Sequence, residues 1–165
     1  LLLVSALIGL LTTGLVNKLE ELRRGRTFVI ERDHTLILGW SASVFTIISE
    51  LDIAGEGRTR PRIVVLADKD KVEMEAEIRT KVGKLKNVKV ICRRGQPIDL
   101  DDLAIVNPDD ARAIIVLAPE GGDADTHVLK TILALTNNPD RKAGRYHIVA
   151  ELRDPKKQEV AKLIV

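Results

Sequence analysis

From residue 35 onward, short apolar runs alternate with amphipathic segments, and this alternation limits the possible folds more than any other feature. The runs are apolar almost without interruption, which is typical of strands buried on both faces of a parallel sheet. Helices that cover both faces complete such a fold. The sequence therefore predicts a doubly wound parallel α/β (Rossmann-like) domain over residues 34–165. The predicted strands cover residues 35–40, 62–70, 88–95, 111–121 and 146–152.

The segments between these runs have helical spacing. Val44, Ile47, Ile48 and Leu51 recur at intervals of three and four residues, which places them on one helical face. The same spacing predicts helices over residues 71–85 and 125–136, a short helix that ends before Asn107-Pro108, and the start of another helix over 156–165.

The first part of the chain differs from the rest. Residues 1–16 carry no charge, and residues 17–26 contain four basic side chains. A membrane-spanning helix needs about 20 apolar residues, and basic residues beside a span mark its cytoplasmic side. We interpret residues 1–17 as the end of a transmembrane helix in a longer protein. Residues 18–33 are then a cytosolic linker helix. A signal-peptide core and a buried helix of a soluble protein are the alternatives.

Composition argues against several functions. Aromatic residues make up 2% of the chain and the net charge is only +2, so a nucleic-acid partner is not expected. Cys92 is the only cysteine, which excludes a disulfide framework and a cysteine-rich zinc site within this sequence. The three histidines have no mutual spacing that indicates a metal site.

A ligand of such a fold binds at the carboxyl ends of the strands. The candidate binding residues lie at or just after the carboxyl ends of the first four predicted strands: Gly39, Trp40, Ser41, Asp68, Lys69, Arg93, Gly95, Ala118 and Glu120.

The dinucleotide fingerprint G-x-G-x-x-G is incomplete at this site. Gly39 is present, but Ser41 and Val44 stand where the second and third glycines would be. Asp68 ends the second strand, where an acid can accept ribose hydroxyls, although it lies farther from Gly39 than the usual distance of about 20 residues. Arg93 is a candidate phosphate clamp. The alternatives are a structural turn at Gly39, a helix cap at Asp68 and a solvated arginine.

Asp99, Asp101 and Asp102 form an oxygen-rich cluster of the kind that suits Ca²⁺. Capping of the short helix that follows explains them equally well.

Longer strings of residues point to a family. HTLILGW, VLADKDKVEME, VICRRGQPIDLDDL, ARAIIVLAPEG and HIVAEL resemble the CASTOR/POLLUX family of ion channels, which has bacterial relatives. LIGLLTTGLVNKLEELRRGR, at residues 7–26, is similar to the end of that family's pore helix and its linker. The resemblance covers nearly the whole chain.

The resemblance implies a homotetrameric cation channel, conducting K⁺ or Ca²⁺. Its cytosolic RCK-type Rossmann domains, of the TrkA-N kind, form a gating ring beneath the pore. It also implies an integral membrane protein, with this domain on the cytoplasmic side and no enzymatic activity. NAD(H), an adenine nucleotide or Ca²⁺ are the candidate ligands. The alternatives are a nucleotide-sensing regulatory domain of a K⁺ transporter, an NAD-dependent oxidoreductase domain and a purely structural scaffold.

Overall fold

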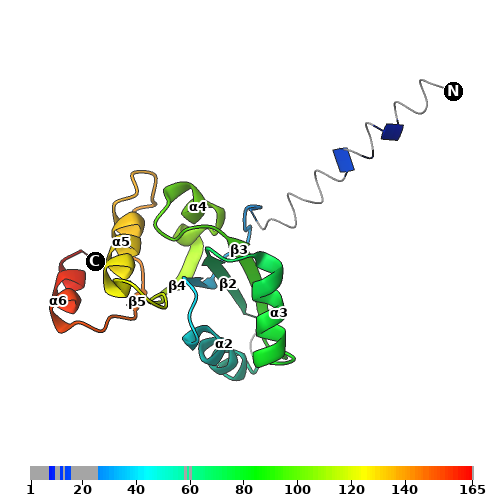
Figure 1. Ribbon diagram of the computed structural model, residues 1–165, viewed down its shortest axis with the longest axis horizontal. Helices are drawn as coiled ribbons and strands as arrows, with labels where there is room; N and C mark the ends of the chain where they lie inside the picture. The colour runs from blue at the N-terminus through cyan, green and yellow to red at the C-terminus, as the bar shows by residue number, and fades with distance from the viewer. Residues whose placement is uncertain are drawn as a thin grey trace.

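The structure, a computed structural model, describes residues 8, 9, 12, 14, 15, 26–57, 59 and 61–164. Its centre is a parallel five-stranded sheet with the strand order β3-β2-β1-β4-β5 (Figure 1). This is the doubly wound arrangement that the alternation predicts. The strands are β1 (His34–Leu38), β2 (Arg62–Ala67), β3 (Lys89–Arg94), β4 (Ala111–Val116) and β5 (Ile148–Ala150).

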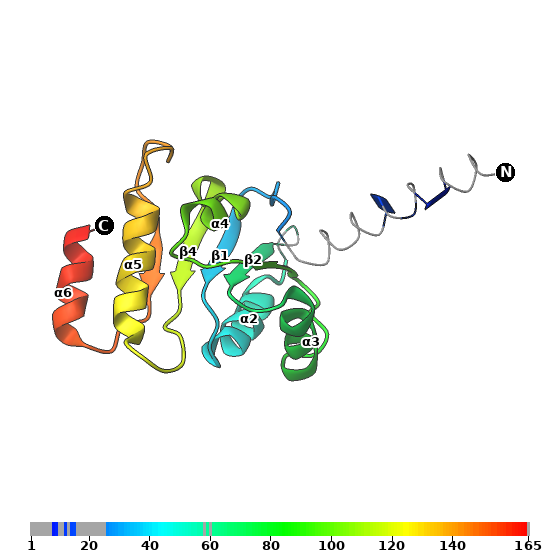
Figure 2. The same ribbon diagram turned by 45° about the horizontal axis from the view of Figure 1, so that its top comes forward.

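The helices cover both faces of the sheet (Figure 2). Helices α2 and α3 pack on one face, and α4, α5 and α6 pack on the other. The helices are α2 (Ser43–Ala54), α3 (Lys71–Lys81), α4 (Leu100–Ile105), α5 (Ala124–Thr136) and α6 (Pro155–Ile164), with a 3₁₀ turn η1 (Pro108–Asp110) before β4.

The two faces explain why the apolar runs are continuous. In β1, all five residues are buried, and they point alternately into the two cores. Leu36 and Leu38 contribute to the core under α4, α5 and α6, whereas Ile37 contributes to the core under α2 and α3. A strand with one solvent-exposed face alternates apolar and polar residues, whereas a strand buried on both faces has no need of polar residues.

The edge strands β3 and β5 are only partly buried, which fits their positions in the sheet. In β3, Cys92 is fully buried under α3, whereas Ile91 packs on the opposite face. The strands also end earlier than predicted: β2 stops at Ala67 and β4 at Val116, because the following residues turn into the loops at the carboxyl end of the sheet.

The predicted transmembrane segment lies almost entirely outside the described residues, although the five described positions within residues 8–15 are helical. Within the described part of the chain, none of the helices has both the length and the apolar character that a membrane crossing requires. The predicted linker helix over 18–33 does not reach its expected end, because residues 26–33 form no helix. Val29 is buried instead against the core under α4, and its N–H donates to the carbonyl of Ile105.

Candidate functional site

The sheet order reverses between β1 and β4, and this point defines the candidate site. From β1 the chain proceeds through β2 to β3 on one side, and it returns to β4 on the other. The loops that leave β1 and β4 therefore diverge above the sheet, and doubly wound folds bind ligands in the crevice that results. Gly39 is the first residue after β1, and its N–H donates to the carbonyl of Leu66 at 2.9 Å.

Gly39 is required by its backbone conformation and by its surroundings. Its φ is +99°, a value that L side chains rarely adopt. A Cβ at this position would lie 2.9 Å from the carbonyl oxygen of Leu117, just after β4. Gly39 thus lets the turn into α2 pass closely beside the neighbouring strand.

A pocket of about 500 Å³ lies above this turn. It brings together residues from the ends of β1, β2 and β4 and from helix α3. The lining therefore shows which of the predicted binding residues lie close to one another. The predicted residues in its lining are Trp40, Ser41, Asp68, Lys69 and Glu120; Ala42, Phe45, Glu77, Lys81 and Pro119 complete it.

Ser41 lines this pocket and carries an unpaired polar atom. The residue is 7% exposed, and its buried Oγ has no hydrogen-bond partner among the described residues. Helix α2 starts two residues later, its N-cap Ala42 has no side-chain cap bond, and its first turn carries no acidic residue. The free N–H groups of a helix start attract anions. This end of the pocket is therefore suited to one phosphate or carboxylate group.

Lys69 and Glu77 form an ion pair inside the pocket, with Nζ and Oε1 2.7 Å apart. The bond to Glu77 raises the pKa of Lys69, and the bond from Lys69, with a further one from Trp40, lowers the pKa of Glu77. Trp40 also stacks edge-on against Phe45, with ring centroids 5.5 Å apart. Lys69 is thus charged but already engaged, so an anionic ligand must compete with Glu77 for it.

A second pocket, of about 570 Å³, lies on the other side of Asp68. Asp68 belongs to both linings, and its carboxylate is 61% exposed and 4.0 Å from Arg94. Gly95 and Gln96, which follow β3, line this second pocket together with Arg26. A ligand that passes over Asp68 would reach both pockets.

Arg93 lines neither pocket. It lies in phase with Ile91 on β3, and its Nε donates to the carbonyl of Thr27 at 2.6 Å. Burial lowers its pKa. The structure thus gives the predicted phosphate clamp a different partner, the segment that enters the domain.

The aspartates predicted as a Ca²⁺ site serve other bonds. Asp99 caps α4 by accepting from the N–H groups of Asp101 and Asp102. Asp102 accepts from Arg26 and from the Gln96 N–H. Among the described residues there is no group of three acidic, histidine or cysteine side chains that could hold a metal, so a Ca²⁺ site is not supported.

Ala118 lies two residues after β4 and lines neither pocket; its backbone N–H donates to Oε2 of Glu151 at 3.2 Å. Sequence reasoning missed Glu77 and Lys81 in the pocket and the bonds of Asp102. Glu77 and Lys81 lie one helical turn apart on α3, and that spacing was the available signal.

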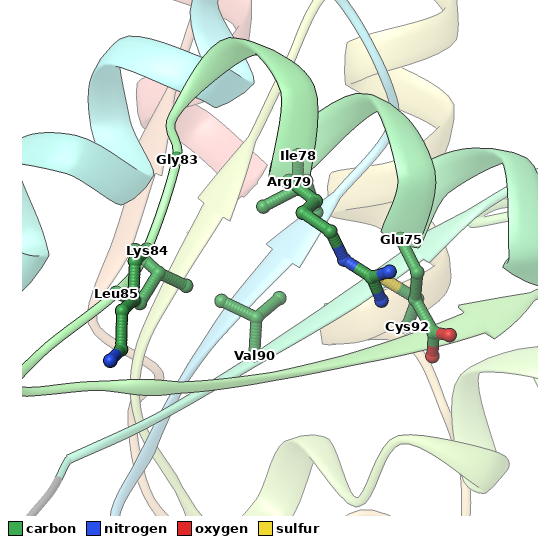
Figure 3. Close-up of a pocket in the computed structure, with 8 residues that line it drawn as sticks. All are labelled: Glu75, Ile78, Arg79, Gly83, Lys84, Leu85, Val90 and Cys92. Atoms are coloured by element: carbon green, nitrogen blue, oxygen red, sulfur yellow. The ribbon is translucent and has the colours of Figure 1, made fainter.

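A third hollow, of about 520 Å³, lies at the sheet edge between α3 and β3, away from the strand ends. Figure 3 shows Val90 and Leu85 facing the gap below Ile78, with Arg79 reaching over Cys92. Burial raises the pKa of the Cys92 thiol to about 12. A single helix and a single strand with its connecting turn form this hollow, so it lacks the convergence of loops found above Gly39.

The fold defines a doubly wound parallel α/β domain of the Rossmann-like type, with pockets at the carboxyl ends of its strands. No profile of a known protein family matches the chain. Direct comparison with single proteins does find relatives. A probable ion channel CASTOR of Oryza sativa subsp. japonica is 42% identical over 166 residues, which cover 99% of this chain and 18% of that protein. The ion channel CASTOR of Lotus japonicus is 37% identical, and a probable ion channel POLLUX of Arabidopsis thaliana is 36% identical; each match covers 99% of this chain and 19% or 20% of the relative.

Over nearly its whole length, the chain is homologous to a segment of the CASTOR/POLLUX ion channels, which confirms the resemblance seen in its sequence. It spans about a fifth of the length of these relatives.

Solved structures confirm the fold. The RCK domain of GsuK superposes with a TM-score of 0.61 at 21% identity, over 86% of this chain and 26% of that one. A GsuK channel bound to NAD superposes with a TM-score of 0.62 at 21% identity, over 95% of this chain and 25% of that one. The chain therefore has the Rossmann-like fold of an RCK domain.

Proposed function

We propose that this chain is the cytosolic regulatory domain of a cation channel, in which a small ligand at the strand ends controls the pore. The match of 99% of the chain to ion channels, at 36–42% identity, carries this proposal. The fold of an RCK domain supports a regulatory role for the segment. The proposal includes a homotetramer, a membrane anchor before residue 18 and a domain without enzymatic activity.

The chemistry of the pocket supports a nucleotide as the ligand. The N–H groups at the start of α2 offer donors to a phosphate, and the exposed Asp68 carboxylate can accept ribose hydroxyls. The second pocket beyond Asp68 has room for a base. Because one of the superposed channels is described as bound to NAD, we propose NAD(H) or an adenine nucleotide for this chain.

The site also differs from a typical dinucleotide-binding turn at the position that would lie closest to the pyrophosphate. The side chain of Ser41 stands where a glycine would let the backbone approach a pyrophosphate closely. We expect contact with the phosphates to depend on Lys69, which must leave Glu77 to make it.

Calorimetric titration of the full-length protein with NAD⁺, NADH, ATP and ADP, combined with cation flux into liposomes, tests the proposal. Lys69→Ala should weaken binding about tenfold, the equivalent of one charge-assisted hydrogen bond. Glu77→Gln should strengthen it, because it frees Lys69. Arg79→Ala, at the hollow between α3 and β3, is the control and should change neither affinity nor flux.

Two results would contradict the proposal at different levels. If nucleotides bind but neither Lys69→Ala nor Glu77→Gln changes the affinity, the site is misplaced. If no nucleotide binds and none alters the flux, a ligand-controlled domain is the wrong function. Consumption of NADH with carbonyl compounds would favour the oxidoreductase alternative instead.

A further inference from the structure

Two arginine bonds hold the segment that enters the domain against α4 and the carboxyl end of β3. Arg26 donates from Nη2 to Oδ1 of Asp102 at 2.6 Å, and Arg93 donates to the carbonyl of Thr27. Two residues later, Val29 is 5% exposed and its N–H donates to Ile105 at 2.7 Å. Residues 26–29 are therefore held by side chains and backbone of the β3–α4 region.

Asp102 holds a second segment at the same time. Its other oxygen, Oδ2, accepts from the N–H of Gln96 at 2.8 Å, in the loop after β3. The residue is only 6% exposed. A Cβ on the neighbouring Gly95 would lie 2.8 Å from the Asp102 carboxyl carbon, so the absence of a side chain at residue 95 is what lets the carboxylate approach this loop.

The loop that Asp102 holds is part of the wall of the second pocket. Gly95, Gln96 and Arg26 all line that pocket beside Asp68. One carboxylate thus has one oxygen on the pocket wall and the other on the entering segment, which lies 76 residues away in the sequence.

We infer that Asp102 is a positioning residue that couples the loop after β3 to the segment entering at Arg26. A change in the loop shifts the carboxylate and loosens Arg26, and a change at Arg26 loosens the Gln96 N–H in return, because coupling between two sites is reciprocal. That a ligand in the pocket uses this coupling rests on the proposed function, but the coupling itself does not.

Hydrogen exchange of the full-length protein without any ligand tests this coupling separately from nucleotide binding. Gly95→Ala should displace Asp102 and raise exchange several-fold in peptides that cover residues 26–30. Arg26→Gln should raise exchange at Gln96, on the opposite side of the carboxylate. In an Asp102→Asn background, each of these two changes should have little further effect.

The control is Gly55→Ala at the end of α2. The Cβ of an alanine at residue 55 would also be crowded, at 3.2 Å from atoms of Asn87 and Val88. Residue 55 lies at the opposite end of the sheet from the Arg26–Asp102 bond. It should leave exchange at residues 26–30 unchanged. Amides of β1 and β4 report in the same data whether each variant is folded.

The inference is wrong if Arg26→Gln leaves Gln96 exchange unchanged, or if folded Gly95→Ala leaves residues 26–30 unchanged. Should Gly95→Ala unfold the domain, Arg26→Gln still decides, because the Arg26 side chain is 60% exposed and its replacement is mild. A merely stabilising role would raise exchange in β1 and β4 as well, and that result would also overturn it.

Discussion

Replacing Gly39 by alanine should lower the free energy of unfolding by about 2–4 kcal/mol. The backbone at φ +99° costs an L residue about 1–3 kcal/mol. The new Cβ would also meet the Leu117 carbonyl oxygen at 2.9 Å, and relieving such a contact in a packed region costs about 1–3 kcal/mol. The sum is reduced because one backbone shift relieves both costs in part.

Urea denaturation of a fragment covering residues 26–165 measures this loss, with the fluorescence of Trp40, the only tryptophan, as the probe. Gly57→Ala is the matched control. Gly57 has φ +77°, but no described atom lies within 4 Å of the place its Cβ would take, so this variant reports backbone strain alone, about 1–2 kcal/mol. Equal losses for the two variants would refute the argument that Leu117 crowds residue 39.

Three further predictions concern two carboxylates that accept backbone hydrogen bonds and one buried thiol. Asp52→Ala removes the carboxylate that accepts from three consecutive N–H groups before β3, and urea denaturation should show a loss of about 2–3 kcal/mol, with a smaller loss for Asp52→Asn. Asp125 accepts from the N–H groups of Asp154 and Arg153, which lowers its pKa. Its stabilisation is therefore complete above the unfolded value near 3.9 and is lost as the pH falls through the lower folded value. Asp125→Asn should flatten the acid side of the stability profile, and an unchanged slope would contradict this. Cys92, with its pKa raised to about 12, should react with iodoacetamide at pH 8 only after urea is added, and rapid native labelling would disprove its burial.

The sheet could be predicted because its signal is local. The apolar runs of the central strands β1 and β2 are buried by neighbours on both faces, and β1, with five buried residues, shows this most clearly. Gly39 could also be predicted, since a turn between a strand and a helix in this fold requires its conformation. The end of β4 is harder to predict, because Val116 is followed by Leu117 and Ala118, which continue the apolar pattern of the strand.

The bonds of the arginines and aspartates could not be predicted in the same way. Arg93 lies near the carboxyl end of a strand, where a phosphate clamp would be expected. Because side chains alternate along the strand, Arg93 lies on the same face as Ile91 and opposite to Cys92, and there it donates to Thr27. Asp102 resembles a helix-start residue, and only the fold brings Arg26 to it. Partners so distant in sequence leave no local pattern, so their roles depend on the three-dimensional arrangement.

The charges around the pocket make a last prediction about which nucleotide binds. Its lining holds the carboxylates of Asp68, Glu77 and Glu120 against the two ammonium groups of Lys69 and Lys81. A triphosphate would bring several negative charges into this excess of carboxylates, whereas NAD⁺ carries less net negative charge because its nicotinamide ring is cationic. Like charges at such short range disfavour binding. Without divalent cations, NAD⁺ should therefore bind more tightly than ATP, and Glu77→Gln should narrow the difference. Tighter binding of ATP to the unmodified protein would show that the phosphates do not lie beside these carboxylates.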